Sequence, residues 1–240
     1  MIEFGIAAWV WSVDGATLAG VGTAETSASV IELPSAERRR LNPLSAATLR
    51  AAERLVAARP RDAVREVPLV FGSADGDGAV LLKLLRALRE REPLSPTQFH
   101  NSVHNAPAGY WSIGLSSTAA TTAIAAGADT PEVALAEAGL QAIAANAPAI
   151  MVVANGRFTD ELAVPRPGAQ PLTLAAWCEP LQPTSRWRCA LTPRSAETTA
   201  DGPTLEQAVR SRGAAGFELS RWVAGLGHVM TLTPHARVAT

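Results

Sequence analysis

The chain has 240 residues, enough for one large domain or two small ones, and its 21 Lys and Arg nearly balance its 22 Asp and Glu. Because these charges are interspersed, no basic stripe is present for binding phosphates, and we do not expect nucleic acid as a partner. Charged residues make up 18% of the chain, below the roughly 25% of an average soluble protein, which fits either a surface covered by another protein or the Arg- and Ala-rich bias of a GC-rich genome.

The first apolar run, IEFGIAAWVW at residues 2–11, is bounded by the turn-like SVDG. A short run of this kind is typical of a strand buried on both faces of a sheet, and we expect a central strand. Glu3 and the lack of a basic region argue against a signal peptide, and no apolar run approaches the roughly 18 residues of a membrane span. We therefore expect a soluble, cytoplasmic protein.

Two amphipathic helices and a second strand are predicted next. A polar loop at 32–43 leads into residues 44–60, where apolar side chains recur at helical spacing until Pro60. VPLVFG at 67–72 has the composition of a buried strand, and residues 77–92 have the periodicity of a helix. The apolar stripe of this helix consists of Leu81, Leu84, Leu85 and Leu88.

The turn FGSADGDGAV between these two elements has the glycines and acids of a ligand loop. A phosphate-binding loop requires Lys and then Ser or Thr after its glycines, whereas Gly78 is followed by Ala79 and Val80. A calcium loop that begins at Ser73 requires a bidentate acid at its twelfth position, which is Leu84. We therefore interpret the segment as a strand-to-helix turn with an Asp-capped helix.

A loop at 93–109 comes before a helix with clear start signals. Thr130 suits an N-cap, Pro131 suits the first helical position and Glu132 suits the first turn. PAIMVVANG at 148–156 follows this helix as a third buried strand.

The C-terminal third contains two strand-like runs and two helix-like runs. Residues 172–179 and 186–192 are separated by turn residues and predict a hairpin. Residues 204–213 and 217–227 predict a final pair of helices. The alternation of strands and helices favours an α/β domain with a mostly parallel mixed sheet flanked by helices.

The reactive side chains form no complete catalytic motif. Cys178 and Cys189 lie in strand-like segments, and we expect both to be buried free thiols. His100 and His104 have a spacing that would let both bind zinc on a helix, but the neighbouring Asn and Pro residues disfavour a helix, and we expect no metal site. GLSST at 114–118 lacks the Gly-x-Ser-x-Gly pattern of a serine nucleophile.

Three segments together resemble the N-terminal half of β-ketoacyl synthases of the thiolase fold: NAPAGYWSI at 105–113, TTAIAAGADT at 121–130 and AIMVVANGRF at 149–158. Upstream, RRRLNPLSAATLRAAERLV is similar to that family's first long helix, and VPLVFGSADGD is similar to its strand and glycine turn. The similarity covers roughly residues 1–165. It implies a thiolase-like half-fold, with residues 1–240 as a single ketosynthase-like N-terminal domain.

In that family an elbow places a cysteine at a helix N-terminus, where the helix dipole favours the thiolate that accepts an acyl group. Local matching puts this position at Ile124, and counting back from the third strand puts it at Ala128 or Asp129. We prefer the second alignment because a helix start follows it. Neither alignment supplies a thiol, and Cys178 and Cys189 follow too late in the chain.

The family's two catalytic histidines lie in a C-terminal half for which 240 residues leave no room. We therefore expect no catalytic residues and no independent activity, and we expect neither a metal nor a cofactor. The resemblance implies an auxiliary subunit instead. The chain is similar to chain-length factors, which pair with an active ketosynthase, and to the small ketosynthase-like subunit of bacterial aryl polyene pathways.

By this resemblance the partner is a full-length ketosynthase in a heterodimer for fatty acid, polyketide or polyene biosynthesis, with acyl carrier protein contacted only indirectly. The segments 105–111 and 125–130 would then supply pocket and interface residues. These candidate residues are Asn105, Gly109, Trp111, Ile124, Gly127, Asp129 and Thr130.

Two alternatives stay open. An independent acyl hydrolase or acyltransferase on the same half-fold would use Ser116, Ser117 or Asp129 with a histidine such as His104, and would need such a pair within hydrogen-bond reach. A homodimeric acyl-binding protein would hold acyl chains without turning them over.

Overall fold

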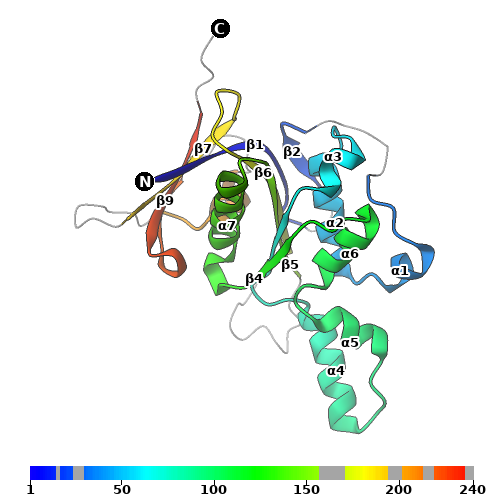
Figure 1. The fold of residues 1–240 in the computed structure, drawn as a ribbon. Helices are drawn as coiled ribbons and strands as arrows, with labels where there is room; N and C mark the ends of the chain where they lie inside the picture. The colour runs from blue at the N-terminus through cyan, green and yellow to red at the C-terminus, as the bar shows by residue number, and fades with distance from the viewer. Residues whose placement is uncertain (15–16, 24–29, 157–170, 194–201, 213–218, 236–240) are drawn as a thin grey trace.

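The computed structural model describes residues 1–14, 17–23, 30–156, 171–193, 202–212 and 219–235. In these residues nine strands form one mixed sheet in the order β4-β3-β5-β6-β1-β7-β9-β8, with β2 added to β1 (Figure 1). The strands are β1 (Ile2–Ser12), β2 (Ala19–Val21), β3 (Leu69–Gly72), β4 (Thr121–Ile124), β5 (Ala149–Asn155), β6 (Leu172–Glu179), β7 (Trp187–Pro193), β8 (Leu219–Val223) and β9 (His228–Pro234). The helices are α1 (Ser35–Arg40), α2 (Pro43–Val56), α3 (Arg61–Arg65), α4 (Gly78–Glu90), α5 (Pro96–Ser102), α6 (Ala106–Leu115), α7 (Thr130–Ala145) and α8 (Leu205–Arg212). None of these described helices has the length and apolarity to cross a bilayer.

The N-terminal strand β1 lies in the middle of the sheet, between β6 and β7, as its apolar sequence predicts. The register of its pairing with β6 shifts between Ile6 and Ala8, so the alternation of its side chains changes there. Phe4, Ile6 and Trp9 belong to the core on one face, and Ala8 and Val10 belong to the core on the other. The strand is therefore buried on both faces.

Helices cover both faces of the sheet (Figure 1). α7 and α8 pack on the face to which Phe4 points, whereas α2, α3 and α6 pack on the face of Val10. α7 approaches β1 closely, because a Cβ added at Gly139 would lie 2.4 Å from the Phe4 ring. The predicted α/β class and the helix-flanked mixed sheet are thus confirmed.

The expected predominance of parallel pairing is wrong. Among the described strands only the pairs β3–β4 and β3–β5 are parallel, and the other pairs are antiparallel. The predicted hairpin of residues 172–179 and 186–192 is also wrong, because β1 lies between β6 and β7 and pairs with both. Local sequence patterns identify strands, but long-range contacts decide which strands become neighbours.

Three segments differ locally from their prediction. The loop expected at 32–43 contains α1. This helix has no buried residue, and its sequence SAERRR has no apolar periodicity from which a helix could be predicted. The loop expected at 93–109 contains α5, where the Ser95 hydroxyl accepts the Gln98 N–H at 3.4 Å, and the start of α6. The helix expected at 217–227 is instead β8 followed by a 3₁₀ turn, because β9 provides a pairing strand.

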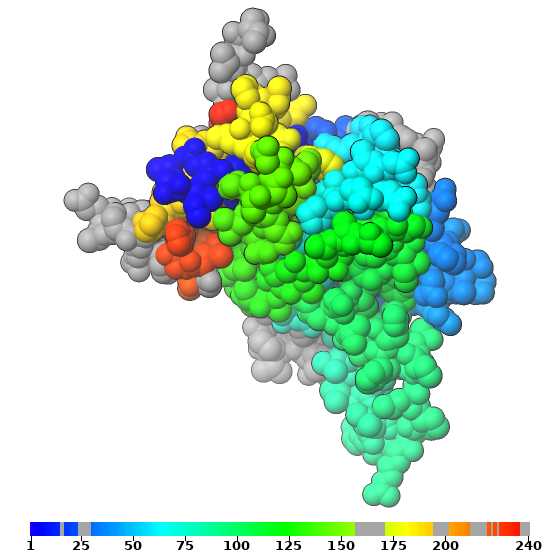
Figure 2. Space-filling model, in the orientation of Figure 1, coloured from blue at the N-terminus to red at the C-terminus, as the bar shows by residue number. Residues whose placement is uncertain are grey.

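The lobe formed by α4 and α5 (residues 78–103) projects from the body of the molecule (Figures 1 and 2). As predicted, Asp77 caps α4, since its Oδ1 accepts the Val80 N–H at 3.0 Å. Of the apolar stripe on α4, only Leu84 is buried. The exposed members are Leu81 at 46%, Leu85 at 48% and Leu88 at 57%. The lobe therefore presents apolar side chains to the outside.

Candidate functional site

The carboxyl ends of the parallel strands β3, β4 and β5 meet at one edge of the sheet, where α/β folds commonly bind ligands. The Ser73 N–H donates to the Ile124 carbonyl at 3.1 Å, and the Ala74 N–H donates to Asn155 Oδ1 at 3.0 Å. The His104 Nε2 lies 2.8 Å from the Ser73 carbonyl oxygen. Asn155 was not among the predicted site residues, although a polar residue at the end of a buried strand is a signal that would identify it.

The segment after β4 forms a tight elbow into α7. Gly127 has a left-handed φ of +55°, and the Thr130 hydroxyl donates to the Gly127 carbonyl at 2.8 Å while it accepts the Ala126 N–H at 2.9 Å. Asp129 occupies the N-cap position and Thr130 is the first helical residue, so the prediction of Thr130 as the N-cap is wrong by one residue. The reason is that the Thr130 hydroxyl bonds back to the elbow instead of forward to the helix.

An ion cluster lies at the start of α7. Arg221 on β8 bonds to Asp129 Oδ1, and its Nε lies 3.5 Å from Glu132 Oε1. The same Glu132 oxygen accepts the Leu205 N–H at 2.6 Å, at the start of α8. Glu132 is fully buried, and this burial raises the pKa of its carboxyl, which the Leu205 hydrogen bond and the Arg221 charge partly oppose. Arg221 was not among the predicted site residues, because its partners are distant in the chain.

The two alignments of the missing nucleophile fall in different settings. Ile124 is the last residue of β4 and pairs with β3, whereas Ala128 and Asp129 directly precede α7. Only the second alignment places the position at a helix N-terminus, where the dipole favours an anion. That place is taken by the Asp129 carboxylate, which is paired with Arg221.

The candidate residues of the segment 105–111 divide between surface and core. Asn105 and Gly109 are exposed at the start of α6, and a Cβ added at Gly109 would meet no atom within 4 Å. Trp111 is 1% exposed and belongs to the core between α6 and the sheet, so its indole supports the fold of α6. The elbow brings together the other four candidates, Ile124, Gly127, Asp129 and Thr130.

The candidate reactive side chains that the structure describes do not form a catalytic pair. Cys178 and Cys189 are buried free thiols, as predicted, and burial raises the pKa of both. Ser117 donates to the Arg65 carbonyl, and His104 contacts a backbone carbonyl, so this serine and this histidine do not form the pair that a hydrolase would need.

The two histidines of the FHNSVHN segment lie on different elements. α5 contains His100 and ends at Ser102, so His104 does not share a helix face with His100. The His100 ring packs on Tyr110 with centroids 5.7 Å apart. In the part of the chain that the structure describes, no group of three or more His, Cys, Asp and Glu side chains is placed to hold a metal ion.

The outer edge of β4 is not paired by any described strand. α6 and α7 contact β4 from opposite faces of the sheet, and Gln141 on α7 donates to Thr122 Oγ1 at 3.1 Å. Ile113 on α6 and Leu140 and Ile143 on α7 are exposed. An open strand edge between helices with exposed apolar side chains is suited to pairing with a strand of another chain.

The sequence matches the family model described as the N-terminal domain of β-ketoacyl synthases over residues 11–227. No curated protein matches it. A solved structure of the ketosynthase ApeO in complex with its chain length factor ApeC, from Xenorhabdus doucetiae, contains a similar chain. That chain is 21% identical with a TM-score of 0.67, and the match covers 97% of the present chain and 100% of the other.

Two further solved structures share the fold. A β-ketoacyl synthase from Burkholderia phymatum STM815 is 10% identical with a TM-score of 0.59, over 88% of this chain and 69% of that chain. The ishigamide ketosynthase/chain length factor is 12% identical with a TM-score of 0.55, over 83% of this chain and 69% of that chain. The thiolase-like fold expected from the sequence is therefore confirmed.

Proposed function

The chain belongs to the β-ketoacyl synthase family through its N-terminal domain, and from this premise we propose that it is a non-catalytic, chain-length-factor-type subunit that pairs with an active β-ketoacyl synthase. Its pathway would elongate polyene or fatty-acyl chains on acyl carrier protein, as in bacterial aryl polyene biosynthesis. Residues 1–240 would act as a single ketosynthase-like domain, since β1 to β9 share one sheet.

The observation that carries this proposal is the open edge of β4. A strand edge exposes backbone N–H and C=O groups that a second chain can pair. The exposed apolar residues Ile113, Leu140 and Ile143 on the flanking helices would lose water when a partner covers them, which favours association. A match along the full length of a chain in a ketosynthase and chain length factor complex supports the same role.

The elbow supports a non-catalytic role. A β-ketoacyl synthase requires a thiolate at this place, and here Asp129 is paired with Arg221 beside the buried Glu132. Both cysteines are buried in the sheet with raised pKa values, so neither thiol can replace the nucleophile.

The α4–α5 lobe would supply the length-limiting wall of the acyl pocket. Leu81, Leu85 and Leu88 are exposed in the chain alone, and in the complex they would be available to contact the growing apolar chain. The elbow residues Ile124, Gly127 and Asp129, together with Asn105 and Gly109, would line the partner-facing side, whereas the predicted interface residue Thr130 is fully buried and supports the elbow from within.

The test is co-expression of the tagged chain with the ketosynthase encoded nearest to it, followed by native mass spectrometry. We expect a stable one-to-one complex. The double variant Leu140→Asp/Ile143→Asp should lose the complex, because two carboxylates would be buried without partners. The matched control is Val13→Asp, which adds a charge at an exposed apolar residue directly after β1, a strand that is not adjacent to β4.

A homodimer or a monomer that does not bind the ketosynthase would overturn the proposal. A homodimer that binds acyl chains would favour the acyl-binding alternative. Equal complex formation by the double variant and by wild type would show that pairing uses another surface.

A further inference from the structure

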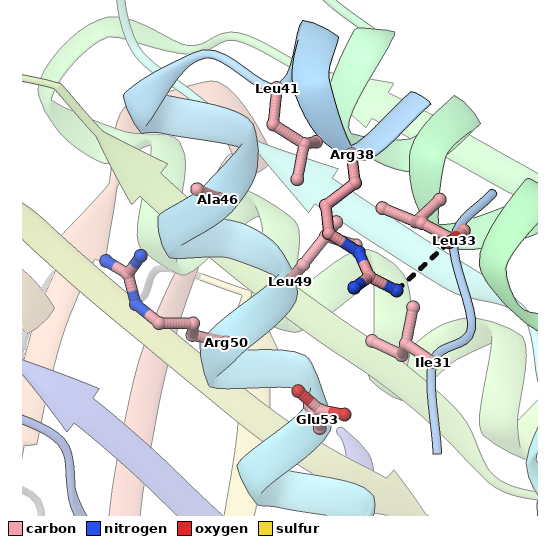
Figure 3. A pocket seen from close by; sticks show the side chains of 8 residues that line it. All are labelled: Ile31, Leu33, Arg38, Leu41, Ala46, Leu49, Arg50 and Glu53. Carbon is pink, nitrogen blue, oxygen red and sulfur yellow. Dashed lines mark hydrogen bonds between the residues drawn. The ribbon is translucent and has the colours of Figure 1, made fainter. Parts of the chain in front are cut away.

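A cavity of about 340 Å³ lies between α1, α2 and the segment that leads into α1 (Figure 3), and none of its lining residues belongs to the elbow or to β4. This volume is at the lower end of the range of small-molecule sites, which is roughly 300–1,000 Å³. The cavity is open to solvent. Nothing in the proposed pairing with a ketosynthase uses it.

The floor of the cavity is apolar. It is formed by Ile31, Leu33, Leu41, Ala46 and Leu49. Ile31, Leu33 and Leu49 are buried members of the core under α2, so an apolar chain in the cavity would rest directly on the core. Removing such a chain from water is favourable in proportion to its buried area.

The rim of the cavity carries more positive than negative charge. Arg38 on α1 and Arg50 on α2 line it, together with the single acid Glu53. The Arg38 Nη2 donates to the Leu33 carbonyl at 3.2 Å, and this bond holds the guanidinium above the apolar floor (Figure 3). Arg50 extends from the other side of α2, so Arg38 is the guanidinium nearest the floor (Figure 3).

We infer that this cavity binds an amphipathic anion, a carboxylate or phosphate carried on a single apolar chain. The chain would lie on Leu33 and Leu49, and the anionic head would accept N–H groups of Arg38 that the Leu33 carbonyl does not use. A guanidinium has five N–H donors, so one bond to a carbonyl leaves capacity for a bidentate bond to an anion.

The cavity's shape favours a small molecule over a partner helix. Two helices and one extended segment border a single hollow that is open to solvent, whereas a groove for a helix requires a continuous apolar channel. The arginine over the floor distinguishes the site from a simple packing defect, because a defect does not need a charged group at its mouth.

The test is isothermal titration of the full chain with dodecanoate below its critical micelle concentration, and with dodecanol as the uncharged analogue. We expect one dodecanoate per chain and about tenfold weaker binding of dodecanol, because the charge-assisted bond to Arg38 is lost. Arg38→Gln should weaken dodecanoate binding about tenfold and leave dodecanol binding unchanged. Arg50→Gln should have a smaller effect.

Ala46→Phe should abolish binding of both ligands, because the new ring would occupy the cavity. Matched controls are Ala144→Phe, at an exposed position of α7, and Arg89→Gln, at an exposed arginine of α4. Circular dichroism would establish that each variant is folded, and Arg38→Gln, at an exposed position, decides the test if Ala46→Phe does not fold.

The inference would be overturned by no dodecanoate binding to wild type, by equal binding of dodecanoate and dodecanol, by unchanged dodecanoate binding by Arg38→Gln, or by unchanged binding by a folded Ala46→Phe variant. Binding to phosphatidylglycerol vesicles without binding to free dodecanoate would also overturn it. The test uses the chain without a ketosynthase, so its failure would leave the proposed pairing untouched.

Discussion

Arg221 on β8 bonds to Asp129 at the start of α7, which lies 92 positions earlier in the chain. Through Glu132 the same cluster reaches the first turn of α8, because the Glu132 Oε1 accepts the Leu205 N–H. The cluster thus links β8 and the start of α8 to the elbow, for which the preferred sequence alignment predicts the nucleophile position. In the described part of the chain, Glu132 Oε2 has no hydrogen-bond partner, so the charge on Glu132 depends on Arg221 and Leu205 for stabilisation.

Replacing Arg221 by Met should destabilise the protein, because it leaves the buried Glu132 without its cation. We expect a loss of about 2–3 kcal/mol in the free energy of unfolding, measured by urea denaturation. The control is Arg89→Met, since Arg89 pairs with Glu90 on the surface and should contribute less than about 0.5 kcal/mol. Equal effects of the two substitutions would show that the Arg221 cluster does not stabilise the fold.

Glu132 should make stability depend on pH. Because burial raises its pKa in the folded state above the ordinary value of about 4.3, the folded protein binds this proton more readily than the unfolded chain does. The contribution of Glu132 to stability therefore rises as pH falls from above the folded-state pKa toward about 4.3, and is constant below that.

Glu132→Gln should remove this contribution. The difference in unfolding free energy between wild type and Glu132→Gln, followed from neutral pH toward pH 4 (roughly the ordinary glutamate pKa), should shift in favour of wild type as the pH is lowered. A difference that is constant with pH, or that shifts in favour of the variant, would contradict the raised pKa.

Two helical glycines should respond in opposite ways to substitution by alanine. A Cβ at Gly139 would lie 2.4 Å from the Phe4 ring, so Gly139→Ala should cost about 1–3 kcal/mol through overpacking. Gly109 on α6 has open space for a Cβ, and Gly109→Ala should stabilise the chain by about 0.5–1 kcal/mol through helix propensity. Thermal and urea unfolding of both variants would check this contrast. If Gly109→Ala also weakens the complex with the ketosynthase, Gly109 lies in the interface.

Adjacent leucines on α4 should also differ. Leu84 is buried, and Leu84→Ala should cost about 2–3 kcal/mol, whereas Leu85→Ala should change stability by less than about 0.5 kcal/mol because Leu85 is half exposed. In the reconstituted complex, Leu85→Trp should shorten the product while the unfolding free energy of the lone chain stays the same. An unchanged product distribution would place the length-limiting wall elsewhere.

The local elements were predictable because each depends on neighbours within a few residues. The apolar run of β1, the Asp77 cap of α4 and the start of α7 near Pro131 are all set by spacing and capping. The family could also be predicted from the sequence, since several segments resemble those of the family and occur in the same order. The sequence alone also showed that no cysteine lies at the elbow.

The tertiary structure decided which elements meet. The sequence showed that β6 and β7 are strands, but only long-range pairing places β1 between them and makes most pairs antiparallel. The leucine stripe of α4 has the periodicity of a core helix, yet Leu81, Leu85 and Leu88 are exposed because no described element covers them. Arg221 can pair with Asp129 only after folding brings β8 close to the start of α7. Periodicity and capping are local properties of a chain, whereas strand order, the covering of an apolar face and the pairing of buried charges depend on contacts that folding alone creates.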